Sequence, residues 1–447
     1  MRVLVLLTQW LPPTSYFRQS PAQVESHAST STMHIYTPSK VSSSISLGNM
    51  LSYSFIGAER VITLISSRNS VEKLVLSHNK LGNEGCAVLC KFLRSTIGKR
   101  YAISVINLNF NAIGNEGLSA ISEFLKDDQH LKELFLQNVS WIVTLTREFK
   151  FTYKQNSFSG DPPTTSKFVN AVNNSNLEVL SLTSNRPLSD AFVEVFLPAL
   201  NAPSLRVLHL SAMNLTPLSC PYILDFITDP QRCHLRALKC NGNSLGLQAV
   251  RSIIRAVTRK NYALVTVELY ANHLESDSLS DTLSSDYDSN GEDTDVDEAA
   301  ALRLAWRACQ HRMNLVLTRN ALLKGYVEWE SLQLLRYARI LLLHAQCIES
   351  SVRLLPAPQM PNNVSPSFTS LPIEIQHHII SFLAPHLSAG QLIRIIGYAS
   401  SANTLPCLLP RLRGNTIHTR ERVGMQNTKE QRRIWLDTLR CSSFEPE

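Results

Sequence analysis

A repeated pattern of leucines and asparagines constrains the fold of this 447-residue chain more than any other feature. Residues 71–93 read VEKLVLSHNKLGNEGCAVLCKFL, and residues 103–125 read ISVINLNFNAIGNEGLSAISEFL. Each copy begins with alternating apolar residues, which are typical of a strand, and ends with apolar residues three and four places apart, which are typical of an amphipathic helix. The asparagine between them can satisfy backbone groups where the chain turns. Each copy therefore predicts one strand, one turn and one helix.

The asparagine position recurs along much of the chain, at successive spacings of 32, 28, 46, 28, 30 and 29 residues. One such unit cannot bury its own apolar face, but stacked units share a continuous core. We therefore expect an α/β solenoid over residues 51–350, with a curved parallel sheet inside and helices outside. The asparagine positions are Asn79, Asn111, 139, Asn185, 213, Asn243 and Asn272.

The repeat frame L-x-x-L-x-L-x-x-N-x-L and its period near 28 residues resemble the ribonuclease-inhibitor-type leucine-rich repeats. The resemblance covers about residues 60 to 345 and includes the N-x-L-G-x-x-G turn of residues 79–85. It implies a leucine-rich-repeat solenoid. The complete arrangement, including the segment LPIEIQHHIISFLAP and the terminal IWLDTLRC, is also similar to uncharacterised fungal proteins with these repeats.

The longest interval between asparagine positions exceeds a spacing of 29 by 17 residues. Residues 139–155 (VSWIVTLTREFKFTYKQ) match no part of the repeat frame, and their removal would place Asn156 in the vacant asparagine position. Val-Ser can be encoded GTAAGT and the final Gln CAG, which are common sequences at intron boundaries. We hypothesise that 139–155 is a retained intron, with a genuine surface insertion as the alternative.

An acidic stretch over residues 275–298 holds ten acidic residues and no basic one. Such a block cannot form a packed element, so we expect a loop that leaves the solenoid before another repeat at Asn320. Four hydroxyl residues in it have an acidic residue three places on, as acidophilic kinases prefer, and phosphorylation would deepen the negative charge. The alternative is an unmodified solvated loop. The candidate phosphorylation sites are Ser278, Ser285, Ser289 and Thr294.

Residues after this stretch are strongly helical in composition up to about residue 350. Val327, Leu334 and Ala338 belong to a series of apolar residues at near-helical spacing, which predicts a helical cap over the open end of the solenoid. Residues 351–369 are rich in proline and read as a linker, and residues 370–447 follow as a small α-helical module with a basic tail.

The beginning of this module, residues 367–395, reads SFTSLPIEIQHHIISFLAPHLSAGQLIRI. Its core resembles the first half of an F-box, LPxEIxxxIxxFL, although an F-box usually precedes its repeats and residues 397–410 replace its closing helix. The resemblance implies contact with the Skp-type adaptor of cullin ubiquitin ligases. The alternative is that the same residues form the core of a helical domain packed on the cap. The residues concerned are Leu371, Pro372, Ile375, Ile379 and Leu383.

The outward-facing strand positions of the repeats predict a second surface, on which a protein partner would bind the concave face of the solenoid. This surface is polar and nearly neutral, and Phe135 and Tyr270 supply the largest contact areas on it. The predicted partner-binding residues are Val75, Ser77, Asn107, Asn109, Phe135, Gln137, Ser181, Thr183, His209, Ser211, Lys239, Asn241, Glu268 and Tyr270.

No motif for catalysis, cofactor binding or metal binding is present. The chain contains no P-loop, GxSxG, HExxH or dinucleotide fingerprint, and its nine cysteines form no CxxC pair. His377 and His378 are adjacent, so a helix directs them about 100° apart. We therefore expect a non-catalytic scaffold that uses no cofactor and no metal.

Ran GTPase-activating proteins share this class of repeat, so GTPase activation is the alternative function that the resemblance implies. Such a protein presents an Arg or Asn from a loop at the sheet edge to the nucleotide on its partner. Arg186, directly after Asn185, is the candidate by placement.

Charge, hydropathy and the amino terminus indicate which partners and which cellular location to expect. The net charge of +7 comes mainly from a surplus of five basic residues over 411–440, where only Trp435 supplies an aromatic side chain, so nucleic acid is not an expected partner. No apolar run is long enough to span a membrane. Residues 1–50 lack a secretory signal and read as a disordered lead-in, and the cysteine pattern fits a reducing compartment. We expect an intracellular protein, cytoplasmic or nuclear.

Overall fold

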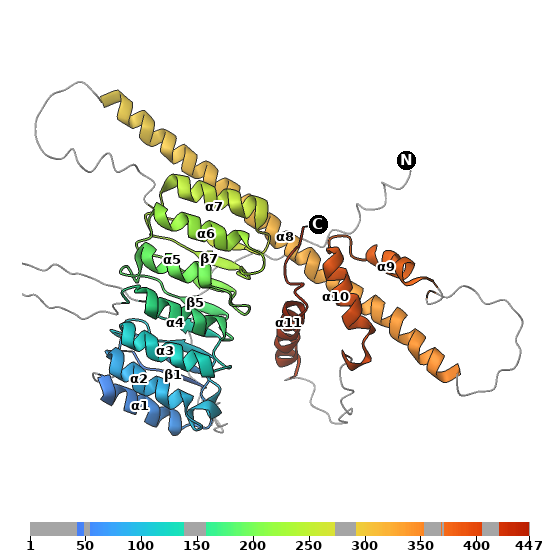
Figure 1. Ribbon diagram of the computed structural model, residues 1–447, viewed down its shortest axis with the longest axis horizontal. Helices are drawn as coiled ribbons and strands as arrows, with labels where there is room; N and C mark the ends of the chain where they lie inside the picture. The colour runs from blue at the N-terminus through green and yellow to red at the C-terminus, as the bar shows by residue number, and fades with distance from the viewer. Residues whose placement is uncertain are drawn as a thin grey trace, which may run out of the picture. The chain divides into compact units, whose positions relative to one another are not determined.

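Eight short parallel strands stack in chain order into one sheet, which is the feature that organises the solenoid (Figure 1). The computed structural model describes residues 43–48, 54–137, 158–272, 292–352, 368, 371–404 and 420–446. The strands are β1 (Ser44–Ser46), β2 (Lys73–Val75), β3 (Val105–Asn107), β4 (Glu133–Phe135), β5 (Val179–Ser181), β6 (Val207–His209), β7 (Ala237–Lys239) and β8 (Thr266–Glu268).

One helix follows each of the first seven strands, and consecutive helices pack against each other in a single layer (Figure 1). This strand and helix alternation confirms the α/β solenoid that the repeats predict. The seven helices are α1 (Ser54–Ser66), α2 (Gly82–Arg94), α3 (Asn115–Asp127), α4 (Pro162–Asn173), α5 (Ser189–Ala199), α6 (Cys220–Thr228) and α7 (Gly246–Lys260). Short 3₁₀ helices at Gly98–Tyr101 and Pro217–Ser219 complete the second and sixth units.

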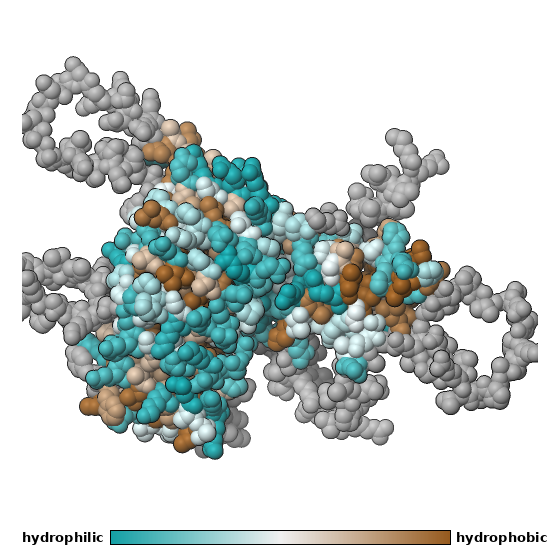
Figure 2. Space-filling model, in the orientation of Figure 1, coloured by the Kyte–Doolittle hydropathy of each residue, from teal (hydrophilic) through white to brown (hydrophobic). Residues whose placement is uncertain are grey.

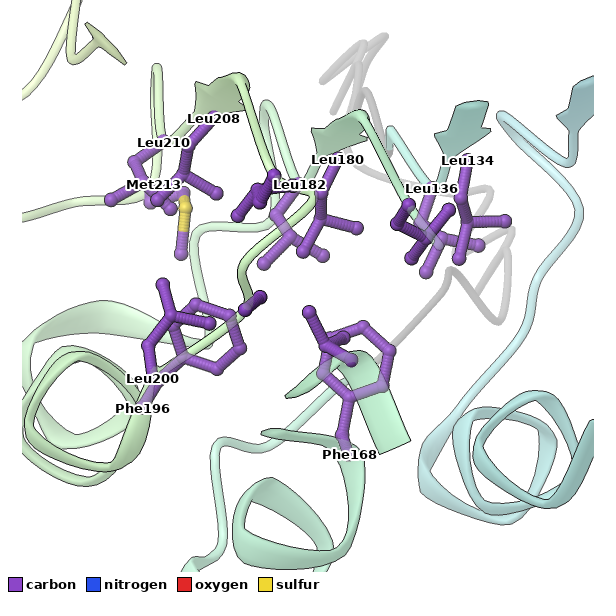
Figure 3. Close-up of a cluster of buried hydrophobic side chains, with 14 of the residues drawn as sticks. Leu134, Leu136, Phe168, Leu180, Leu182, Phe196, Leu200, Leu208, Leu210 and Met213 are labelled. Carbon is purple, nitrogen blue, oxygen red and sulfur yellow. The ribbon is translucent and has the colours of Figure 1, made fainter. Parts of the chain in front are cut away.

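The strand register places one buried apolar residue of each repeat beside the next. Leu134 of β4 pairs with Leu180 of β5, which in turn pairs with Leu208 of β6. These side chains and the next inward leucine of each repeat point toward the helix layer, where Phe168 and Phe196 meet them (Figure 3). Because every repeat adds the same apolar layer, the core is continuous from β1 to β8.

The repeated asparagines lie buried at the turns after five strands, β2, β3, β5, β7 and β8. Asn185 donates its amide hydrogens to the carbonyl oxygens of Leu136 (2.9 Å) and Leu182 (2.7 Å), and therefore joins its own repeat to the preceding one. Asn243 does the same with the carbonyls of Leu210 and Cys240, at 2.9 and 3.0 Å. The asparagines thus satisfy backbone acceptors that the turn removes from water, as the sequence predicts.

The solenoid begins before residue 51, where the sequence placed its start. Ser44–Ser46 form β1, in which Ile45 is buried and pairs with Leu74 of β2. This unit has serines on both sides of Ile45, and Met50 stands where the next repeat has Asn79, so the repeat frame is not recognisable in it. Residues 1–42 of the lead-in expected over 1–50, the stretch 139–155 and most of the linker 351–369 lie outside the described residues. Strands β4 and β5 pair directly on either side of 139–155.

Helix α8 (Glu292–Val352) replaces the further repeat that Asn320 predicted. That prediction was wrong because the apolar spacing around Asn320 suits a helix as well as a strand and turn. Asn320 is buried within α8 and donates to the carbonyls of Asn261 (3.0 Å) and Leu264 (2.7 Å) in the loop before β8. The loop expected over the acidic stretch 275–298 also ends earlier than predicted, because the helix begins at Glu292.

The two halves of α8 pack in two different hydrophobic cores. Cys309, Met313 and Val316 of the first half pack on the last solenoid unit and cap it. Val327 and Leu334 of the second half, which the sequence assigned to the cap, instead pack in a second core. That core also contains residues of α9 (Ile373–Ser381), α10 (Ala389–Ser400) and α11 (Arg420–Thr438).

Candidate protein-interaction surfaces

The sheet face opposite the helices carries the predicted partner-binding residues. Thirteen of the fourteen are half-buried or exposed, and Tyr270, which is 52% exposed, is the most accessible of them. Ser181 is the exception, because it is only 3% exposed. It lies in register between the larger side chains of Phe135 and His209, which account for its burial.

Charges on this face are paired with one another. Lys239 lies 2.9 Å from Glu268, which also accepts a hydrogen bond of 2.7 Å from the Asn241 amide. The hydrogen bond from Lys239 holds the pKa of Glu268 below its usual value, although partial burial opposes the shift. Burial and the nearby Lys239 cation together lower the pKa of His209. A partner on this face therefore meets a largely neutral surface.

A second row of residues, the edge row, lies along the end of the sheet at which the strands begin. Each of its members directly precedes one of four strands. This edge row is charged and consists of Lys132, Glu178, Arg206 and Arg236. Backbone hydrogen bonds place its members side by side, as in the 2.9 Å bond from the Arg206 amide to the Glu178 carbonyl. The sequence analysis missed this row, although charged residues just before successive strands were its signal.

Helix α11 lies along the edge row and matches its charges. Arg433 Nη1 lies 2.9 Å from Glu178, and Asp437 lies 2.8 Å from Arg236 and 3.6 Å from Arg206. Glu430 lies 3.7 Å from Lys132. Residues 430, 433 and 437 share one helix face because they are spaced by three and four.

Burial and ion pairing act in opposite directions on the edge row. Partial burial raises the pKa of Glu178, but the hydrogen bonds from Arg433 and Lys132 outweigh it and leave this pKa below its ordinary value.

Another face of α11 is apolar, since Leu436 is buried and Trp435 and Leu439 pack in the second core. Helix α11 thus joins the second core to the solenoid.

The F-box-like residues form a third surface on and around α9. Pro372, Ile375, Ile379 and Leu383 are exposed, and Leu371 is half-buried. Ile380 is instead the fully buried residue of this helix. The four exposed residues therefore do not form the core of the module, which was the alternative interpretation.

The neighbourhood of α9 presents further apolar side chains to solvent. Phe382 is 72% exposed, and Ile373 is also exposed. Figure 2 shows hydrophobic residues gathered over the part of the molecule where α9 lies. Large contiguous apolar patches on a folded protein commonly mark interaction sites.

Other residues that the sequence singled out do not come together into a site. Arg186 is exposed and follows the buried Asn185. Ser278, Ser285 and Ser289 lie outside the described residues, as does the side chain of Thr294.

Burial raises the pKa of the Cys240 thiol to about 12, and all seven cysteines whose side chains are described are buried and free. Within the described ranges, no group of His, Cys, Asp and Glu has the arrangement of a metal site.

Comparison with known proteins agrees with the geometry. The family model for the Leucine Rich repeat matches residues 69–90 and 103–122, which span β2, β3 and much of α2 and α3. The fold is a leucine-rich-repeat solenoid. No curated protein matches the chain. Leucine-rich repeats are in general non-catalytic interaction domains, so the repeats indicate a protein-interaction scaffold. Among the helices that the structure describes, none combines the length and the apolar character needed to span a membrane.

Proposed function

We propose that this leucine-rich-repeat protein is a non-catalytic scaffold that binds a protein partner on the concave face of its solenoid. We further propose that the surface around α9 binds a Skp-type adaptor, so that the chain acts as a substrate receptor of a cullin ubiquitin ligase. The two surfaces belong to different parts of the chain, as a receptor that brings a substrate to a ligase requires.

The exposure of the F-box-like residues is the observation that carries the adaptor proposal. Ile375 and Ile379 are one helical turn apart on α9, and both face solvent instead of the second core. Full burial of an isoleucine side chain is worth roughly 1.5–3 kcal/mol, and since each of these two is somewhat less than half exposed, roughly half of that free energy remains unused per residue. A protein that covers this surface recovers that free energy, which supplies the driving force for docking.

The adaptor proposal is tested on the full chain, because α8 supplies Val327 and Leu334 to the core that holds α9. Purified Skp-type adaptor is titrated against the wild type and against the double variant Ile375→Asp with Ile379→Asp. The control is Ile97→Asp with Leu218→Asp, which places the same two charges at exposed apolar positions of the solenoid. We expect saturable binding by the wild type and the control, and its loss in the double variant. No binding by the folded wild type contradicts the proposal.

The concave-face proposal is supported by Tyr270, the large accessible aromatic side chain on a strand face whose charges are otherwise paired. Aromatic residues at such positions commonly contribute most of the binding free energy. Quantitative affinity capture compares the wild type with Tyr270→Ala, and uses Tyr337→Ala on α8 as the control, since Tyr337 is also exposed. Proteins lost from the Tyr270 variant alone would be concave-face partners. Equal recovery of every protein by all three forms would contradict this use of the face.

A further inference from the structure

A cavity of about 520 Å³ lies where the residues that follow α11 meet the solenoid edge. Its solenoid wall comes from the loops before β6, β7 and β8, and its other wall comes from α10 and residues 440–446. Tyr262 and Phe444 contact each other across these walls, with ring centroids 5.3 Å apart. The volume lies within the range of pockets that hold small molecules, roughly 300–1,000 Å³.

Positive charge dominates this cavity. Its lining contains five Lys or Arg side chains but two carboxylates, a surplus of three positive charges. The basic residues come from the solenoid, from α10 and from the segment just after α11, so the fold brings together residues that are far apart in the chain. They are Arg206, Arg236, Lys260, Arg394 and Arg440, and the two carboxylates belong to Asp437 and Glu445.

The two carboxylates are already engaged. Asp437 is shared between Arg236 and Arg206, and Glu445 lies 2.7 Å from Arg394 and accepts a hydrogen bond of 2.8 Å from Ser388. In the part of the chain that the structure describes, Lys260 and Arg440 lie within ion-pair distance of no carboxylate. These two cations therefore remain available to an anion from solution.

Neighbouring cations contribute to the pKa shifts of two groups that line the cavity. Burial lowers the pKa of Arg206, and although Asp437 opposes the shift, the neighbouring Arg236 and Arg433 cations add to it. Burial likewise lowers the pKa of His234, with contributions from the Arg206 and Arg440 charges. The buried Nε atom of Arg394 also lacks a hydrogen-bond partner among the described residues.

We propose that this cavity binds a small soluble molecule that carries at least two phosphate groups. Each phosphate carries a charge of about −1.5 to −2 near neutral pH, so two of them match the surplus of three positive charges. Guanidinium groups bind phosphate oxygens through paired hydrogen bonds, and the Ser442 and Ser443 hydroxyls that line the cavity are further donors.

The ligand would bridge the solenoid and the C-terminal residues, since Lys260 lies at the end of α7 and Arg440 directly beyond α11. Because the cavity exists only when both parts are folded and docked, binding stabilises the docked state by mass action. This inference is independent of the adaptor-binding proposal, because no α9 residue lines the cavity.

The test is isothermal titration of the full chain with inorganic pyrophosphate at constant ionic strength. Lys260→Gln and Arg440→Gln each remove one exposed cation of the cavity. Arg255→Gln is the matched control, because Arg255 is exposed on α7 but does not line the cavity. Circular dichroism confirms that each variant is folded, and Lys260→Gln, at an exposed helix end, is the variant that preserves the test if Arg440→Gln does not fold.

We expect one pyrophosphate per chain, about ten-fold weaker binding in each cavity variant, and binding within about two-fold of the wild type in the control. Absence of saturable binding by the wild type would overturn the proposal. Equal affinity in the cavity variants and the control would also overturn it. Sulfate that binds as tightly as pyrophosphate would exclude the requirement for two phosphate groups.

Discussion

Arg433 of α11 lies 2.9 Å from Glu178, a residue 255 positions earlier in the chain that immediately precedes strand β5. Arg433 also contacts Glu430 on its own helix, at 2.5 Å, and Glu178 also contacts Lys132, at 3.1 Å. A single continuous network of charges therefore holds the C-terminal helix on the edge of the solenoid.

A double-mutant cycle tests this contact. We expect Arg433→Ala and Glu178→Ala each to lower the free energy of unfolding, with a coupling energy of about 1 kcal/mol, because both side chains are partly buried but still reach solvent. Chemical denaturation of the wild type, the two single variants and the double variant measures this coupling. Additive effects of the two single variants would show that the pair does not interact in solution.

The same network predicts a pH dependence of stability. The pKa of Glu178 and that of Glu430 lie below their ordinary value because of hydrogen bonds from Arg433 and Lys132. Their contribution is therefore complete above the unfolded-state pKa of about 4.3, and is lost as the pH falls through the lower folded-state pKa.

Unfolding free energies of the wild type and Glu178→Gln, measured between about pH 7 and pH 3, provide the check. The difference between them should be constant at neutral pH and should shrink below the unfolded-state pKa. A difference that grows on acidification would have the wrong sign for an ion-paired carboxylate.

The buried asparagines predict a large effect of a small change. Asn185→Ala leaves the carbonyls of Leu136 and Leu182 without their donor, so we expect a loss of about 2–4 kcal/mol of unfolding free energy. Asn170→Ala is the control, because Asn170 is exposed in the interior of helix α4. Similar midpoints of denaturation for the two variants would be incompatible with this role of Asn185.

Much of the fold could be predicted from sequence because its determinants are local and repeated. The alternation around Leu74 and the asparagine that follows it lie within a few residues, and each copy independently predicts the same strand and turn. Asn320 was misassigned because the apolar spacing around it suits a long continuous helix as well as the strand and turn of a repeat. The burial of Ser181 depends on Phe135 and His209 in neighbouring repeats, which no local pattern contains.

The docking of α11 on the edge row and the cavity could not be predicted, because the residues that meet there are distant in the chain. The pairing of Glu178 with Arg433 depends on how α11 docks, and nothing near either residue specifies it. By contrast, the exposed side of α9 follows from short motif residues such as Ile375 and Ile379, although their exposure becomes evident only when Ile380 is seen to fill the core.

The repeat register around residues 139–155 predicts that this stretch can be removed. Phe158 is fully buried. Leu81 and Ile113, which lie two places after the repeated asparagines Asn79 and Asn111, are fully buried as well. Deletion of 139–155 places Asn156 in the asparagine position and Phe158 two places after it.

We therefore expect the deletion variant to fold with a melting temperature equal to or above that of the full chain, as measured by scanning calorimetry. Sequencing of the transcript determines separately whether a message without these 17 codons exists. A deletion variant that fails to fold would contradict the proposal that Asn156 and Phe158 complete the repeat once 139–155 is removed.

Hydrogen–deuterium exchange of the full chain, with and without purified Skp-type adaptor, tests the central functional claim most directly. The account predicts that the adaptor slows exchange over residues 371–383, where Ile375 and Ile379 face solvent, and leaves the strands of the solenoid unchanged. Unchanged exchange over 371–383 at saturating adaptor, or protection confined to the solenoid, would contradict it.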